Sequence, residues 1–142
     1  MNRKSVVGLG VLLLAVGIFV IWQNQQQPTS NQVAIAIPIV HVSLPAQLTT
    51  KAQTGKRRFE ANCVSCHGEN AAGQEGIAPP LVHKIYEPSH HGDESFQRAA
   101  ALGVRAHHWP FGNMPSIEGL NRSEISDIIA YIRELQRANG IF

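Results

Sequence analysis

The sequence predicts a small all-α domain behind an apolar N-terminal segment, and three observations support this prediction. Apolar residues near the C-terminus recur at i, i+3, i+4, i+7 and i+10, the spacing of one helical face. They are Ile125, Ile128, Ile129, Ile132 and Leu135. No convincing strand pattern of alternating apolar and polar residues occurs within residues 51–142. Residues 5–22 are uncharged and consist mostly of Val, Leu, Ile, Gly and Ala.

Three helices are expected in the domain. The C-terminal helix should begin after a capping box formed by Asn121 and Glu124 and stop at an Asn-Gly pair. A second helix is expected over residues 93–102, because two acidic residues occupy its first turn and a glycine follows it. A third is expected over residues 53–62. Residues 51–142 would then form one domain, small for a self-sufficient hydrophobic core.

Residues 5–22 are long enough to cross a membrane. As a helix they would span roughly 27 Å, close to the roughly 30 Å hydrocarbon core of a bilayer. Arg3 and Lys4 precede this segment and Trp22 ends it. Basic residues stay on the cytoplasmic side and Trp favours the membrane interface. We therefore expect an anchor at residues 1–22, with the rest of the chain on the periplasmic or outer side of the cytoplasmic membrane.

A cleaved signal peptide is the alternative for this segment. Such a peptide needs a small-residue cleavage site soon after its apolar core. Residues 23–27 are Gln and Asn instead, and the nearest Ala-x-Ala stands at residues 34–36. The pattern therefore favours an uncleaved anchor.

Residues 23–50 are expected to form a linker or extended arm. Within them, residues 33–40 alternate β-branched residues with alanine and are interrupted by Pro38. This run is too short to cross a membrane a second time. It would either lie on the domain as an extended arm or pair as a short strand with a partner subunit.

Charge and cysteine content exclude several classes of protein. The 12 Lys and Arg residues exceed the 10 Asp and Glu residues only through Arg3 and Lys4. The domain therefore lacks the basic surface that binding to nucleic acid requires. Its two cysteines, Cys63 and Cys66, are too close to build the disulfide framework of a small secreted protein.

The cysteines belong to the motif Cys-Val-Ser-Cys-His, which ends at His67. Two thiols on one helical turn can add to the two vinyl groups of a haem while the adjacent imidazole reaches the iron. A redox dithiol would be expected near a βαβ pattern, and a zinc site would need two more ligands at similar spacing. Neither accompanies Cys63 and Cys66. The motif therefore predicts one covalently attached haem c.

Met114 is the candidate for the sixth iron ligand. The only other methionine is the initiator, Met1. Met114 stands in Phe-Gly-Asn-Met-Pro, a loop sequence rather than a helical face, so a role as core filling is disfavoured. Axial ligation by His67 and Met114 is typical of electron-transfer cytochromes.

Residues 51–139 resemble the class I cytochrome c domain. The family pattern Gly-x-x-x-Phe-x-x-x-Cys-x-x-Cys-His occurs at Gly55, Phe59, Cys63, Cys66 and His67. The resemblance implies that an N-terminal helix crosses the C-terminal helix around one covalently bound haem.

The resemblance also implies two specific contacts. Gly55 would allow close approach to an aromatic residue of the C-terminal helix, for which Tyr131 is the match. The carbonyl of Pro79 would accept the N–H of the proximal imidazole of His67, and a hydrogen bond of this kind fixes the tautomer of a ligating histidine. A plain turn is the alternative role for Pro79 and Pro80.

Five histidines between the motif and Met114 depart from a minimal cytochrome. They are His83, His90, His91, His107 and His108. Three interpretations stay open, namely loop or haem-edge residues, a replacement sixth ligand, and a second site for copper or zinc. Neighbours in a regular backbone point in different directions, which argues against both members of an adjacent pair sharing one site.

Two further groups flank the expected site. Trp109 and Phe111 are expected to pack in the haem pocket. Lys56, Arg57 and Arg58 are expected to form a solvated helix face, with docking of an acidic partner as the alternative.

The sequence thus predicts a membrane-anchored monohaem cytochrome c that exchanges single electrons with donor and acceptor proteins. It would be no enzyme and would take no small-molecule substrate, because both axial positions of the iron are filled. Alternatives are a fixed subunit of a larger oxidase or reductase, and a sensor or peroxidase-like centre with a labile sixth ligand. Metal delivery through the histidines is a further alternative.

Overall fold

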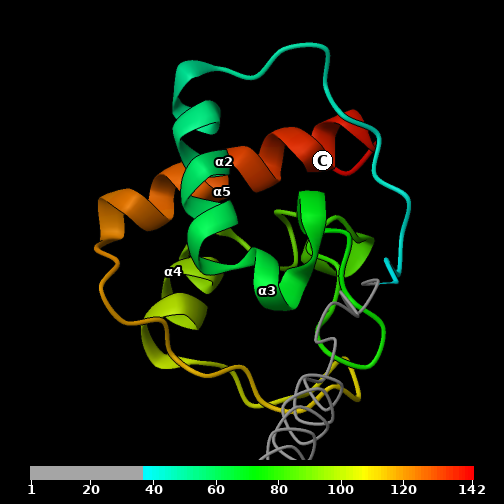
Figure 1. The fold of residues 1–142 in the computed structure, drawn as a ribbon, viewed down its shortest axis with the longest axis vertical. Coiled ribbons are helices and arrows are strands. Elements are labelled where there is room, and N and C mark those ends of the chain that lie inside the picture. The colour runs from blue at the N-terminus through cyan, green and yellow to red at the C-terminus, as the bar shows by residue number, and fades with distance from the viewer. Residues whose placement is uncertain (1–36) are drawn as a thin grey trace, which may run out of the picture. The chain divides into compact units, whose positions relative to one another are not determined.

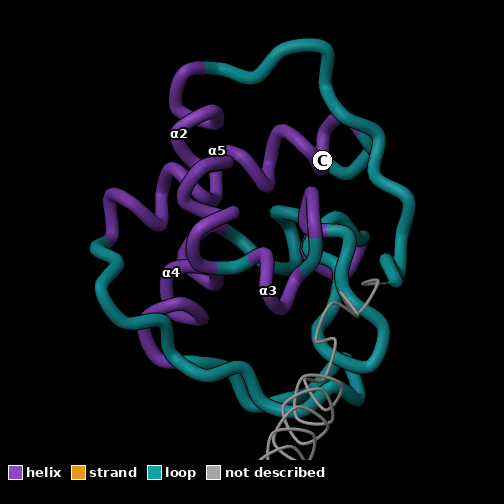
Figure 2. The backbone as a smooth tube through the Cα atoms, viewed as in Figure 1, coloured by secondary structure: helices purple, strands orange, loops and turns teal. Residues whose placement is uncertain are grey.

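The computed structural model describes residues 37–142. In chain order the elements are α2 (Thr50–Asn62), α3 (Val64–His67), the 3-10 turns η1 (Glu69–Ala71) and η2 (Lys84–Tyr86), α4 (Asp93–Leu102) and α5 (Arg122–Ala138). Figure 2 shows only helices and loops along this part of the chain, and pairing between extended segments is limited to isolated bridges. The prediction of an all-α domain is therefore confirmed for the described residues.

The predicted membrane anchor at residues 1–22 lies outside the described residues, as do residues 23–36 of the arm. Among residues 37–142, no helix has both the length and the apolar character needed to cross a membrane.

The hydrophobic core forms where α2 crosses α5 (Figure 1). A Cβ atom on Gly55 would overlap the carbonyl oxygen of Asp127, so the two helix backbones touch at this point. The expectation that Gly55 makes room for Tyr131 is corrected, because the nearest atoms to Gly55 are backbone atoms of Asp127 and Ile128. Tyr131 lies one turn further along α5, where its ring packs against Phe59 at a centroid distance of 5.7 Å.

Tyr131 also connects α5 to the turn that follows the Cys-x-x-Cys-His motif. Its ring is buried, and its hydroxyl donates a hydrogen bond to Oδ1 of Asn70 at 3.2 Å. Burial, with a smaller contribution from the charge of Glu60, raises the pKa of Tyr131 to about 12. The phenol therefore stays protonated at neutral pH and remains a hydrogen-bond donor.

Helix α2 begins at Thr50, three residues before the predicted start. Thr49 caps it, because its Oγ1 accepts from the N–H of Ala52 at 3.3 Å. The same hydroxyl donates to a carboxylate oxygen of Glu134 at 2.6 Å. The start at residue 53 was wrong because the group that orients the cap belongs to α5, far away in the sequence.

The other two helices begin where the sequence predicts. Helix α4 covers the predicted residues 93–102. At the start of α5 the side chain of Asn121 accepts from the N–H groups of Ser123 and Glu124, and the Glu124 carboxylate accepts from the N–H of Asn121 at 3.0 Å. This reciprocal capping box is encoded by neighbours in the sequence, which is why it was predictable.

The expectation of a solvated basic face on α2 is wrong for one of its three residues. Arg57 is exposed and Lys56 is half-exposed, but Arg58 forms ion pairs with Asp127 and, at 3.4 Å, with Glu124. Both acids lie on α5, so Arg58 reinforces the helix crossing rather than facing a partner.

The described part of the arm lies on the domain. The N–H groups of Ile39 and Val40 both donate to the carbonyl of Ala72 at 3.1 Å. Further along, the backbone of Ser43 exchanges two hydrogen bonds with the side chain of Asn139. Residues 37–43 therefore extend the domain at its edge.

Replacing Gly55 by alanine tests the helix crossing. Because the added methyl group would meet backbone, which cannot move aside alone, we expect the free energy of unfolding to fall by about 3 kcal/mol. Urea unfolding of the haem-loaded protein would measure it. Gly92→Ala is the matched control, since Gly92 has an ordinary φ of −62° and its nearest neighbour, the Pro88 carbonyl oxygen, is 3.6 Å from the added atom. Equal losses for the two variants would contradict this role of Gly55.

Candidate functional site

A large pocket opens beside the crossing of α2 and α5. Its volume is about 880 Å³, and apolar side chains from α4, α5 and the surrounding loops form most of its lining. This is the size and character of a site for a large organic ligand. All the site residues predicted from the sequence line it, namely Cys63, Cys66, His67, Pro79 and Met114.

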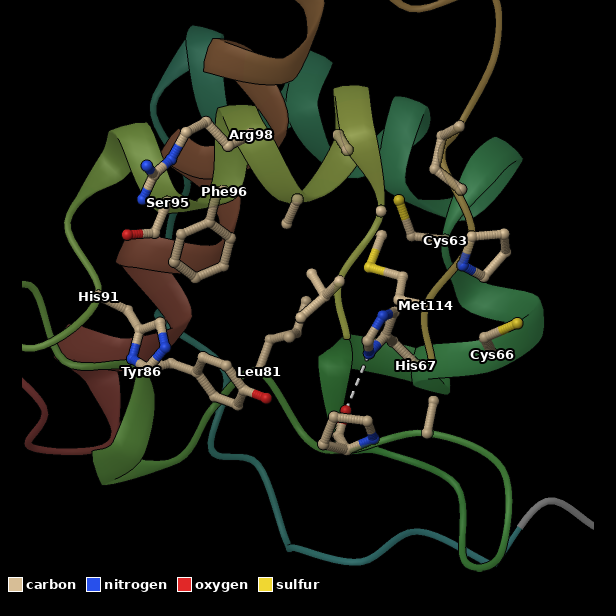
Figure 3. A pocket seen from close by; sticks show the side chains of 18 of the residues that line it. Cys63, Cys66, His67, Leu81, Tyr86, His91, Ser95, Phe96, Arg98 and Met114 are labelled. Atoms are coloured by element: carbon tan, nitrogen blue, oxygen red, sulfur yellow. Dashed lines mark hydrogen bonds between the residues drawn. The ribbon is translucent and has the colours of Figure 1, made fainter. Parts of the chain in front are cut away.

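His67 is held in one tautomer at the end of α3. Its Nδ1 donates a hydrogen bond to the carbonyl oxygen of Pro79 at 2.9 Å (Figure 3). Burial lowers the pKa of His67, although the hydrogen bond to Pro79 opposes this effect. The imidazole is therefore neutral at pH 7, with the lone pair of Nε2 free to bind a metal.

The carbonyl of Pro79 is fixed by the loop that carries it. Pro80 is fully buried, and a Cβ atom on Gly73 would come within 2.5 Å of the Pro80 nitrogen. The N–H of Gly73 donates to the carbonyl of His67 at 2.7 Å. Only glycine, here at a φ of 76°, lets this loop fold back so tightly on itself. The acceptor for His67 is therefore preorganised.

Gln74 was not predicted as a site residue, yet it supports the motif directly. Its buried side-chain amide donates to the carbonyls of Val64 and Ser65 at 3.0 and 2.9 Å. These carbonyls lie within the short helix α3, which has few hydrogen bonds of its own. A glutamine in a glycine-rich loop carries no local signal for this role.

The two cysteines are free thiols three residues apart, Cys63 as the N-cap of α3 and Cys66 within α3. Cys63 is half-buried and Cys66 is exposed. Burial, with a smaller contribution from Cys66, raises the pKa of Cys63 to about 11. Redox-active dithiols have lowered pKa values instead, so this pair does not suit that role. Among the described residues, neither cysteine belongs to a cluster of three groups that could hold a metal ion.

Met114 lies in the loop between α4 and α5, far from α3 in the sequence, and lines the same pocket. Its backbone forms two hydrogen bonds of 2.9 Å with Val104, which close residues 104–114 into a loop. Gly103 permits the pairing, because a Cβ atom there would come within 2.6 Å of the Met114 carbonyl oxygen. The half-buried side chain of Met114 is thus held at the pocket by backbone contacts.

The aromatic side chains expected to pack in the pocket do line it. The rings of Trp109 and Phe111 stack at 5.9 Å with an angle of 11° between their planes. The Nε1 of Trp109 is buried and has no hydrogen-bond acceptor in the structure. This N–H lies close enough to affect the pKa of Tyr86, which burial raises, but the two groups do not reach hydrogen-bonding geometry.

Four of the five unexplained histidines gather at the same pocket, and this corrects one prediction. They are His90, His91, His107 and His108. The expectation that adjacent histidines do not share a site is wrong for His90 and His91, whose ring nitrogens both lie near those of His108. The two occupy a turn rather than a regular helix or strand, so the usual alternation of side-chain direction does not apply. His83 lies apart from this group and packs edge-on against Trp109.

Arg133 is a second residue that the sequence did not identify. It is 7% exposed, and its guanidinium donates to the carboxylate of Asp93 and to the backbone carbonyls of Tyr86 and His91. It thereby ties α5 to η2 and to the turn before α4. A cation on the otherwise apolar face of a predicted helix is the signal that could have identified it.

A sequence model of the family described as Cytochrome c matches residues 52–136, more than half of the chain. The chain belongs to the cytochrome c family. It is also 34% identical over 94 residues to the cbb3-type cytochrome c oxidase subunit FixP of Bradyrhizobium sp. (strain ORS 278). The match covers 65% of this chain but only 30% of that protein. Family membership implies covalently bound haem c and an electron-transfer domain, and such domains are typically carriers rather than catalysts.

The pocket fits a haem on its own chemistry. It is large and apolar, as the porphyrin requires, and two thiols and one neutral imidazole face it from a single turn. The unpaired Nε1 of Trp109 is a buried donor that lacks an acceptor, and the carboxylate of a haem propionate could supply one.

Replacing Gln74 by alanine tests the support of α3. The Ser65 carbonyl would lose its donor and the Val64 carbonyl would keep only the N–H of Gly68, so we expect the free energy of unfolding of the haem-loaded protein to fall by about 1–3 kcal/mol. Gln53→Ala is the control, since Gln53 is exposed and donates a single bond to the Leu48 carbonyl. We expect it to change stability by less than about 0.5 kcal/mol. Thermal unfolding of the Gln74→Ala and Gln53→Ala variants measures this difference. Similar melting temperatures for the two would refute this role for Gln74.

Proposed function

We propose that this chain is a membrane-anchored monohaem cytochrome c that carries single electrons on the outer face of the cytoplasmic membrane. The observation that carries the proposal is the convergence of two thiols, a fixed neutral imidazole and a thioether on one apolar pocket. Family membership supports the cofactor, and the geometry supports which residues hold it.

In this proposal each residue has a distinct part. Cys63 and Cys66 would hold the haem through two thioether bonds, and Nε2 of His67 and Sγ of Met114 would bind its iron. The carbonyl of Pro79 keeps His67 oriented through its Nδ1. The bound haem c supplies a one-electron couple between ferric and ferrous iron.

Electron carriage, rather than catalysis, follows from this arrangement. With His67 and Met114 both as iron ligands, the haem would have no vacant position for a substrate. The pocket is open at its edge, where Ile77 and Leu102 are 51% and 78% exposed. Redox partner proteins could approach there through a small, transient interface of under roughly 1,200 Å².

The proposed location rests on the N-terminal sequence. Arg3 and Lys4 precede the uncharged residues 5–22, and this order favours an anchor with the domain on the periplasmic side. Residues 23–50 would link the anchor to the cytochrome domain at residues 51–142, as a linker whose last part lies on that domain. Tethering would confine the search for partners to the membrane surface.

A second candidate is a fixed subunit of a larger oxidase or reductase complex. The observation in its favour is the 34% identity to a subunit of a cbb3-type cytochrome c oxidase. Purification after mild detergent extraction distinguishes the two. A free carrier elutes alone, whereas a subunit elutes with stoichiometric partner chains.

A pyridine haemochrome spectrum combined with the intact mass tests the cofactor. We expect one haem per chain that acid-acetone extraction does not remove, and a mass that includes the porphyrin. The mass also shows whether residues 1–22 are retained. Colourless protein after expression in a host that matures c-type cytochromes would overturn the proposal, as would zinc in place of iron.

Met114→Ala tests the sixth ligand. We expect the oxidised wild-type protein to show the weak absorption band of the iron–thioether bond and the variant to lose it, because alanine has no ligand atom. His108→Ala is the control, and the band should persist in it. A band that is unchanged in Met114→Ala would reject Met114 as the ligand, and a band that is absent from the wild type would favour a centre with a labile sixth position.

A further inference from the structure

Three histidines form a compact group at the rim of the haem pocket. His90 and His91 lie in the turn before α4, and His108 lies in the loop between α4 and α5. The ring centroids are 4.6 Å apart for His90 and His91, 5.5 Å for His90 and His108, and 5.3 Å for His91 and His108. We call this group the histidine triad. It is separate from His67, and none of the roles proposed above uses it.

The nitrogen atoms of the histidine triad are spaced for a metal ion. Each residue offers one ring nitrogen, and the three nitrogens lie within 4.8 Å of one another. Around a tetrahedral ion with bonds of 2.0–2.1 Å, two nitrogens lie about 3.3 Å apart. The nitrogens of the histidine triad, up to 4.8 Å apart, would have to come closer together to reach this spacing. Because His90 and His108 are exposed, modest rotations of their rings could achieve this without moving the core.

His91 is the fixed member of the triad. Its Nδ1 donates to the carbonyl oxygen of Ile85 at 2.6 Å, which leaves a lone pair on Nε2. Ligating histidines in metal sites are usually held in this way. The backbone carbonyl of His91 accepts in turn from the buried Arg133, whose guanidinium is paired with Asp93. The position of His91 is therefore set by η2 and α5 as well as by its own turn, in which its N–H donates to the Glu87 carbonyl at 2.8 Å.

The histidine triad is not accounted for by ion pairing or by the haem thiols. Among the described residues, no histidine forms an ion pair with a carboxylate, so the three imidazoles are not gathered around an acid. Figure 3 shows His91 on the side of the pocket away from Cys63 and Cys66, so the triad is apart from the thiols.

His107 is a neighbour of the histidine triad but not a member. Its ring lies 4.2 Å from that of His108 but 6.3 Å from that of His91, and its nitrogens do not belong to the group within 4.8 Å that the other three form. The candidate ligands are therefore limited to three imidazoles.

We propose that His90, His91 and His108 bind one divalent transition-metal ion of the zinc class. Three neutral imidazoles suit Zn²⁺ and its neighbours, whereas Mg²⁺ and Ca²⁺ require oxygen ligands and Cu⁺ favours thiolate or thioether. Three protein ligands leave a fourth position for water or for a group from another molecule. The domain would then carry two metal centres, the haem iron and a second ion at the rim of the same pocket.

Zinc binding to the haem-loaded protein tests the proposal. The protein is stripped with a chelator, incubated with Zn²⁺, desalted and analysed for iron and zinc, and the affinity is measured by calorimetry. We expect one zinc per iron. His90→Ala and His108→Ala, both at exposed positions, should each weaken binding at least tenfold.

His41→Ala is the matched control, because His41 is an exposed histidine in the arm, outside the triad. It should leave the affinity unchanged. An unaltered haem spectrum in every variant shows that the fold and the haem ligands are intact. The proposal is overturned if the wild type retains no zinc, which would leave the imidazoles as donors to the haem propionates. It is also overturned if His90→Ala and His108→Ala bind zinc as tightly as the wild type.

Discussion

The contact between the backbones of α2 and α5 at Gly55 is the constraint on which the rest of the domain depends. With no side chain between them, the helices approach until the α2 backbone meets the carbonyl of Asp127. This approach brings Phe59 against Tyr131 and Arg58 against Asp127. Because α3 follows α2 after one residue, the crossing also determines where the Cys-x-x-Cys-His motif begins.

The two residues proposed as iron ligands are positioned by backbone contacts rather than by long side chains. His67 depends on the Pro79 carbonyl, which depends in turn on the glycine-rich loop before it. Met114 is held by two backbone hydrogen bonds to Val104. Backbone groups lose little conformational freedom once the loops are closed, so such positions are rigid. A carrier that changes charge without rearranging benefits from this rigidity.

Arg133 likewise holds backbone groups in place, here at the rim of the pocket near the histidine triad. A single buried guanidinium, compensated by Asp93, satisfies the carbonyls of Tyr86 and His91. A buried charge is tolerated when it is paired and hydrogen-bonded, and here each of the three guanidinium nitrogens of Arg133 has an acceptor. Helix α5 thus contacts α2 at Asp127 and, through Arg133, holds the backbone of His91 in the histidine triad. One helix therefore contacts both α2, which precedes the Cys-x-x-Cys-His motif, and the histidine triad.

The features that the sequence determined are those encoded by near neighbours. The Cys-x-x-Cys-His spacing, the capping box at Asn121, the extent of α4 and the loop around Met114 each depend on residues a few positions apart, so pattern and propensity suffice. The tertiary structure alone decided the partner of Gly55, the ion pairs of Arg58, the burial of Arg133 and the gathering of His90, His91 and His108. These contacts join residues far apart in the chain, and their geometry depends on how the loops close and how closely the helices approach. The periodicity of a sequence carries no information on how loops close or on how closely helices approach. A regular backbone would have kept adjacent histidines apart, but in a turn they could meet.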